Sequence, residues 1–117
     1  MSVHQSPITT HVLDTAQGRP AVGVGVILER LSGHAWQVLG GGTTDVDGRL
    51  RSLLEPGELQ TGTYRLIFET GAYFAEQGIA RSFYPQAVVI FSVADASSHY
   101  HVPLLLSPFG YSTYRGS

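Results

Sequence analysis

The chain has 117 residues, a net charge of −2 and no cysteine. This length fits a single domain, and the lack of cysteine excludes disulfides, thiol nucleophiles and thiolate metal sites. It is also compatible with a reducing compartment, so we expect a cytoplasmic protein.

The charge pattern and hydropathy limit the partners that we expect. All seven basic residues are arginine and lysine is absent. A nucleic-acid footprint would need clustered Lys and Arg, and no stretch approaches the roughly 18 apolar residues of a membrane span. We therefore expect no nucleic acid and no membrane.

Charged residues make up 14% of the chain, against about 25% in an average soluble domain. This favours an oligomer that buries part of the surface over a small neutral monomer.

The first half of the chain predicts short strands. Residues 1–7 are expected to form a flexible N-terminal segment, and residues 8–117 a single domain. A first strand is predicted around His11 in the segment 9–14. Alternating apolar residues predict a second over 22–29. The apolar run 36–39 predicts a third, the Asp-Val-Asp-Gly stretch at 45–48 a turn, and residues 49–54 another strand.

The second half continues the same pattern, with one interruption. Strands are predicted over 64–69, 86–93, 100–106 and 112–115. Residues 71–78 lack alternation, and Gly78 suits a helix C-terminus, so we expect a helix of about two turns there. Pro103 cannot donate a ladder hydrogen bond, so we expect it where its missing N–H costs nothing, such as an edge or bulge. Several short strands with regular turns indicate an all-β, two-sheet sandwich.

Histidines are the first candidates for chemistry. His11 lies in the predicted first strand, where a structural role is the common alternative to a catalytic one. His99 and His101 are two residues apart, so in a strand they share a face. They could bind a metal, act as a base and its neighbour, or be one surface and one site residue. The metal interpretation lacks a third ligand at a recognisable spacing.

Arg49 and the C-terminal tail are the other candidates. An arginine offers a fixed fork of donors that suits a carbonyl or a developing oxyanion, although an exposed strand-end arginine is the commoner case. The tail keeps Phe109, Tyr111 and Tyr114 near its end, unlike a frayed polar terminus, which indicates that it is docked. No nucleophile elbow or phosphate loop is present.

Four segments, in order, resemble the 5-hydroxyisourate hydrolase family of transthyretin-related proteins. The resemblance runs over nearly the whole chain from about Thr9, and the Tyr-Arg-Gly-Ser end is its most specific mark. The segments are Thr10-His11-Val12-Leu13-Asp14 with Gly18-Arg19-Pro20-Ala21, Thr44-Asp45-Val46-Asp47-Gly48-Arg49, His99 to Pro108, and Tyr111 to Ser117.

The resemblance implies a fold, an assembly and a site. It implies a transthyretin-like (prealbumin-like) eight-stranded sandwich with one helix, assembled as a homotetramer (a dimer of dimers) with active sites where the dimers meet. The family's site falls on His11, Arg49 and His101, completed by the tail, in which Ser117 and Tyr114 could hydrogen-bond substrate or water. The role of His99 stays open.

The implied reaction is hydrolysis of 5-hydroxyisourate to a ureidoimidazoline carboxylate in urate breakdown. A histidine, His11 or His101, would take a proton from water, and Arg49 would stabilise the charge that develops on the carbonyl oxygen. The family implies no metal and no cofactor.

The main alternative is a transthyretin-like carrier of small molecules without catalysis. A metal-binding or structural sandwich that uses His99 and His101 is a third possibility.

Overall fold

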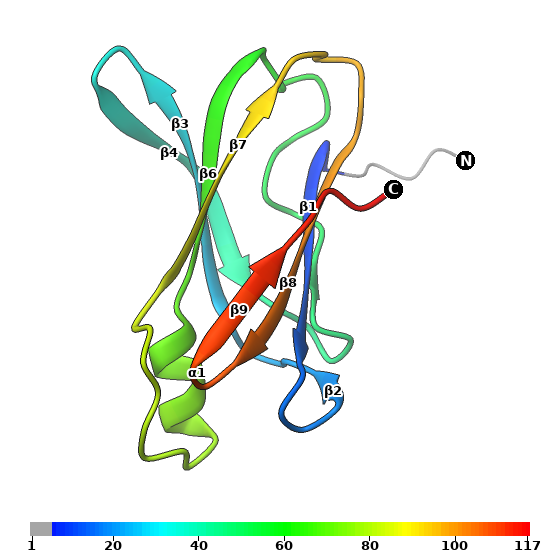
Figure 1. Ribbon diagram of the computed structural model, residues 1–117. Coiled ribbons are helices and arrows are strands. Elements are labelled where there is room, and N and C mark those ends of the chain that lie inside the picture. The colour runs from blue at the N-terminus through cyan, green and yellow to red at the C-terminus, as the bar shows by residue number, and fades with distance from the viewer. Residues whose placement is uncertain (1–5) are drawn as a thin grey trace.

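The protein is a sandwich of two β-sheets with one short helix at one end of the sandwich (Figure 1). A computed structural model describes residues 6–117. The elements, in chain order, are β1 (Ile8–Asp14), β2 (Arg19–Pro20), β3 (Gly25–Ser32), β4 (Ala35–Thr43), β5 (Arg49–Leu50), β6 (Gly62–Phe68), α1 (Thr70–Glu76), β7 (Ala87–Val93), β8 (Tyr100–Ser107) and β9 (Gly110–Thr113).

The two sheets confirm the predicted transthyretin-like architecture. One sheet has the order β2-β1-β8-β9, with β5 also paired to β1, and the other has the order β4-β3-β6-β7. All pairs are antiparallel except β1 and β8, which run parallel. The described residues form nine strands rather than eight, because the two-residue β2 adds a short pairing at the end of β1.

The core lies between the sheets and follows strand periodicity. In β1 and β8 every second residue points into the core and is buried, and the residues between them point outward and are more exposed. The same alternation runs through β6. The largest fully buried side chains are Tyr64, Phe68, Phe74, Ile8, Leu28, Leu53, Leu66, Leu104 and Leu106.

Several predicted strands start or stop elsewhere. The strand predicted over 36–39 is longer, at Ala35–Thr43, and the one predicted over 112–115 lies at Gly110–Thr113. Two further differences have a visible cause. The strand predicted from residue 22 begins at Gly25, because Gly23 has a φ of +82° and Val24 donates its N–H to the Thr44 hydroxyl. The strand predicted over 49–54 pairs with β1 only at Arg49–Leu50. Beyond it, Leu54 donates its N–H to the hydroxyl of Ser6, which draws the chain off the ladder.

The predicted flexible segment 1–7 lies mainly outside the described residues. Of its last two residues, Ser6 is buried, and its hydroxyl accepts the Leu54 N–H at 3.0 Å and the Ile8 N–H at 3.2 Å. Ser6 is therefore packed, although it lies two residues before the expected start of the domain at residue 8.

The predicted helix is confirmed with shifted ends, at Thr70–Glu76. Gly78 takes a φ of +76° and donates its N–H to Ala75, while Ile79 donates to Phe74. This is the Schellman pattern of a helix C-terminus, which requires a left-handed residue and so favours glycine. Across residues 6–117, we find no helix with the length and apolar character to cross a bilayer.

Pro103 lies in β8, which is paired on both sides, yet it meets the predicted condition. The β9 ladder ends at Leu104, which pairs with Thr113, and the next contact of the tail is the bridge between His101 and Gly116. Pro103 falls in the gap between them, where its carbonyl accepts the Thr113 hydroxyl at 2.7 Å.

A buried tyrosine–aspartate pair joins the helix to the end of β1. The Tyr73 hydroxyl donates to Oδ2 of Asp14 at 2.7 Å, and Oδ1 of Asp14 accepts the Gln17 N–H. Burial and the bond to Asp14 raise the pKa of Tyr73 to about 12. The Tyr73 proton thus stays in place throughout the neutral range and satisfies a carboxylate that is 1% exposed.

We expect Tyr73→Phe to lower the free energy of unfolding by about 1–3 kcal/mol, since it leaves a buried carboxylate oxygen without a donor. Urea unfolding at pH 7 measures this. The raised pKa of Tyr73 means that its stabilising effect is complete below about pH 10 and is lost as the pH rises towards about 12. Tyr84→Phe is the matched control, because the Tyr84 hydroxyl has no hydrogen-bond partner within the described part of the chain. Equal stability of the two variants would contradict the role of the pair.

Candidate active site

The outer face of the five-stranded sheet brings together polar side chains that are far apart in sequence. The parallel register places Thr9 beside His101, and the antiparallel pairing places His11 beside Arg49. In each strand, these four side chains occupy the alternate positions that point away from the core. Three strands thus supply adjacent positions on one surface.

The turn before β5 fixes Arg49. Oδ1 of Asp45 accepts the backbone N–H of Asp47 at 2.9 Å and that of Arg49 at 3.0 Å. The bond from Arg49, with that from Asp47, lowers the pKa of Asp45. Gly48 has a φ of +74°, and a Cβ there would lie 2.4 Å from the Val12 carbonyl. Aspartate and glycine are therefore both needed to hold this turn against β1, as the turn prediction required.

His11 is held by the same turn. Its Nε2 lies 2.9 Å from the carbonyl oxygen of Asp47. A carbonyl can only accept, so Nε2 carries a proton, and Nδ1 is the free nitrogen of the neutral ring. Burial and the charge of Arg49 lower the pKa of His11, which keeps the ring neutral at neutral pH.

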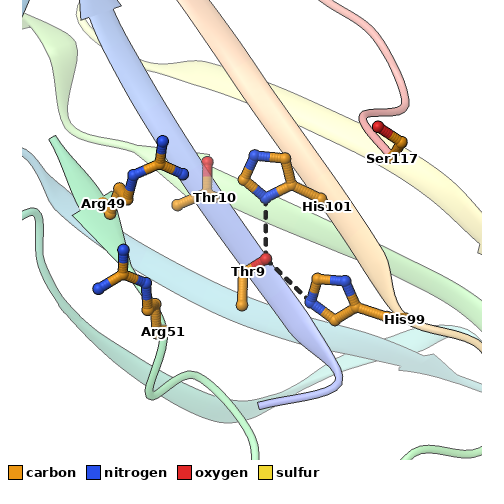
Figure 2. Close-up of a pocket in the computed structure, with 7 residues that line it drawn as sticks. All are labelled: Thr9, Thr10, Arg49, Arg51, His99, His101 and Ser117. Atoms are coloured by element: carbon orange, nitrogen blue, oxygen red, sulfur yellow. Dashed lines mark hydrogen bonds between the residues drawn. The ribbon is translucent and has the colours of Figure 1, made fainter. Parts of the chain in front are cut away.

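A cavity of about 160 Å³ opens beside these strands (Figure 2). Arg49 and Arg51 reach it from one side and the two histidines of the β8 end from the other. Within residues 6–117 neither arginine forms a salt bridge, although the charges of both contribute to the lowered pKa of Asp45. The lining residues are Thr9, Thr10, Arg49, Arg51, His99, His101 and Ser117.

His101 lies at the centre of this group. Its Nδ1 is 2.8 Å from the hydroxyl of Thr9, and Figure 2 shows its other ring nitrogen on the side of Arg49. Burial lowers the pKa of His101, and the charges of Arg49, His99 and His11 lower it further. A neutral imidazole with one free nitrogen, next to a fixed cation, can accept a proton from water.

The C-terminal tail is docked against His101, as predicted. The Gly116 N–H donates to the His101 carbonyl at 2.8 Å. The Arg115 guanidinium lies over the Tyr100 ring, 4.4 Å from its centroid, and donates to the His99 carbonyl at 3.3 Å. These contacts bring Ser117 to the rim of the cavity.

The structure unites some of the predicted site residues and separates others. Arg49, His101 and Ser117 share the cavity, while His11 lies on the same face but is not among its lining residues. Tyr114 is 57% exposed and lines a separate groove between β7 and the tail. Thr9, Thr10 and Arg51, which also line the cavity, were not anticipated. Thr9 lies two residues from His11, so in a strand it points to the same outer face. Only the β1–β8 register shows that its neighbour there is His101.

The metal interpretation of the histidine pair has little geometric support. His99 Nε2 and His101 Nδ1 both contact the Thr9 hydroxyl. No group of three or more His, Cys, Asp or Glu side chains in the described residues is arranged to hold an ion. The groups that meet here, imidazoles, guanidiniums and hydroxyls, are of the kind used in acid–base and electrostatic catalysis.

A two-sheet sandwich of this topology, with histidines and arginines on the outer sheet face, defines a transthyretin-like protein with a polar site. The chain belongs to the HIUase/Transthyretin family, whose model matches residues 8–116.

Individual relatives agree with this placement. The chain is 47% identical to a 5-hydroxyisourate hydrolase of Mus musculus, with all of both chains covered. A solved structure of Klebsiella pneumoniae 5-hydroxyisourate hydrolase is 38% identical, with a TM-score of 0.83 and coverage of 94% of this chain and 97% of that one. Sea bream transthyretin in complex with thyroxine is 33% identical, with a TM-score of 0.87 and 94% of each chain covered.

We expect Gly116→Ala to detach the tail from His101, because the added methyl would lie 2.6 Å from Cδ2 of the His101 ring. Amide hydrogen exchange at residue 116 measures the bond to the His101 carbonyl, and its protection should fall by at least about tenfold. Gly110→Ala is the matched control, since its methyl would meet only the Ser107 hydroxyl, at 3.8 Å. Unchanged protection in Gly116→Ala would contradict the docking.

Proposed function

We propose that this chain is a 5-hydroxyisourate hydrolase, which opens the lactam ring of its substrate to a ureidoimidazoline carboxylate in urate breakdown. The observation that carries the proposal is the cavity in which Arg49, His101 and Ser117 converge. Relatives that match the chain over its whole length carry that name, among them the mouse enzyme.

We assign the roles from the contacts of each side chain. A neutral imidazole, His11 or His101, takes a proton from water as the water oxygen bonds to the ring carbonyl carbon. Arg49 stabilises the negative charge that develops on the carbonyl oxygen. The C–N bond then breaks, and the proton returns to the departing nitrogen. Ser117 holds substrate or water by a hydrogen bond, and the reaction needs no cofactor.

The carrier alternative fits this surface less well. An apolar ligand requires a largely apolar site with few polar groups. This cavity instead presents two arginines and two histidines, and binding a neutral ligand here would leave those groups poorly hydrated. Hydrolysis makes use of the same groups, so the polar lining favours the enzyme.

We also propose that the chain assembles as a homotetramer, a dimer of dimers. Among the described strands, β7 and β9 each pair on one side only. Apolar side chains are exposed along these two edges and the adjoining loops. Tyr114 lines the groove between the edges, so its contribution to a site would require a neighbouring copy. The exposed side chains are Val88, Ile90, Phe83, Tyr84, Phe109, Tyr111 and Tyr114.

Purified protein should speed the decay of freshly generated 5-hydroxyisourate. Alanine at His11, Arg49 or His101 should each lower kcat by about 10²- to 10⁴-fold, the range for a lost general base or oxyanion donor. His34→Ala is the control, since His34 is an exposed residue between β3 and β4. Unchanged rates in all three site variants would overturn the site assignment, and an inactive wild-type protein would overturn the function.

Assembly should be required for full activity. We expect Ile90→Glu to dissociate the oligomer, because it places a charge at the centre of an apolar interface, and to reduce turnover at least about tenfold. Val38→Glu is the matched control: Val38 is 63% and Ile90 61% exposed, but Val38 lies on β4, at the opposite edge of its sheet. Light scattering and the decay assay provide the measurements. A monomer with full turnover would refute this requirement.

A further inference from the structure

The hydroxyl of Thr9 lies between the two histidines of the β8 end (Figure 2). Its oxygen is 2.8 Å from Nδ1 of His101 and 3.1 Å from Nε2 of His99. The two imidazole rings are nearly parallel, with centroids 6.4 Å apart. Thr9 is 6% exposed, whereas His99 is exposed to solvent. A buried hydroxyl thus joins an inner imidazole to an outer one.

Hydrogen-bond counting restricts this group to two arrangements. A threonine hydroxyl has one proton to donate, and no third partner of this hydroxyl exists in the described part of the chain. With neutral rings, Thr9 donates to one ring nitrogen and accepts an N–H from the other. If it donates to Nδ1 of His101, the single N–H proton of the neutral His101 ring is on Nε2, which then cannot act as a base. If it donates to His99, Nε2 of His101 keeps its lone pair.

The surroundings of His101 favour the second arrangement. The groups that face it are His11 from β1, Arg49 from β5, Arg51 beyond that strand, His99 before β8, and Ser117 of the tail. The Arg49 guanidinium has donors but no acceptor. An N–H on the nitrogen that faces Arg49 would therefore point towards a group that cannot accept it, while a lone pair there can accept.

We propose that Thr9 is a positioning residue that holds His101 in the tautomer protonated on Nδ1, so that Nε2 of His101 is the base nitrogen, with His99 completing the chain of hydrogen bonds. This rests on the proposed hydrolase function only for the role of the base, not for the tautomer.

The same chain can move the proton that the base takes. When Nε2 of His101 gains a proton from water, the Nδ1 proton can pass to the Thr9 oxygen as the Thr9 proton passes to Nε2 of His99. The positive charge then lies on the exposed ring of His99, where water solvates it. His101 is left neutral with a proton on Nε2, ready to donate to the departing nitrogen.

The first test is made on the wild-type protein and needs no variant. The ¹⁵N chemical shifts of the imidazole nitrogens distinguish a protonated from an unprotonated nitrogen. At a pH where His101 is neutral, we expect Nδ1 to be protonated and Nε2 to be unprotonated. A protonated Nε2 would overturn the proposal, and this result is independent of whether the protein hydrolyses 5-hydroxyisourate.

The second test removes the hydroxyl. Thr9→Val keeps the side-chain shape, and we expect it to populate the other His101 tautomer, to lower kcat about tenfold or more, and to shift the acidic limb of the kcat–pH profile to lower pH. The shift follows because protonated His101 loses an acceptor for its Nδ1–H. Thr9→Ser should restore most of the rate. Thr15→Val is the control: its hydroxyl donates to the Leu106 carbonyl of β8, at the opposite end of β1 from Thr9.

The third test is a double-mutant cycle between the two ends of the chain. His99→Gln should slow the wild-type enzyme but have no further effect in Thr9→Val, since the coupling of His99 to His101 runs through the Thr9 hydroxyl. Losses that multiply in the double variant would overturn the proposed coupling, as would a Thr9→Val protein with an unchanged tautomer and pH profile.

Discussion

The parallel pairing of β1 with β8 is the constraint on which the site depends. It is the one parallel pair in the described sheets, and it brings Thr9 next to His101 across 92 residues of sequence. The side-chain period of a strand is two, so a slip of one residue would turn Thr9 and His11 into the core. The buried residues of opposite parity, Ile8 and Val12, exclude that slip. Core packing therefore fixes the register that the site requires.

Electrostatics within this register explains why the histidines suit their role. Arg49 lowers the pKa of both His11 and His101, in each case after the larger effect of burial. A fixed cation beside a base has two effects that both favour the reaction. It keeps the imidazole unprotonated at neutral pH, and it stabilises negative charge on a reacting oxygen. In the proposed mechanism, one arginine thus serves both purposes.

Local patterns in the sequence were sufficient for much of the fold. Alternation located β6, a continuous β-branched run located β7, and Gly78 located the helix end. They failed where a distant side chain intervenes: Ser6 takes the Leu54 amide and ends β5 early, and Thr44 takes the Val24 amide and delays β3. No local pattern reports such competition for backbone hydrogen bonds.

Some site residues could likewise be predicted from the sequence, and others could not. Arg49, His101 and Ser117 could be named from the sequence through the family resemblance, because each lies in a distinctive motif. Thr9 could not, since a threonine in a strand is unremarkable until its cross-strand partner is known. Arg51 would share the face of Arg49 in the strand predicted over 49–54, but the segments that carry the family resemblance do not include it, so it was not proposed as a site residue.

Strand β1 is held at both ends by side chains that take no part in the chemistry. Ser6 ties its start to the segment after β5, and Asp14 ties its end to the helix through Tyr73. A strand fixed at two points has little freedom left to lose when a ligand arrives. The site therefore loses its conformational entropy when the chain folds, and not each time a ligand binds.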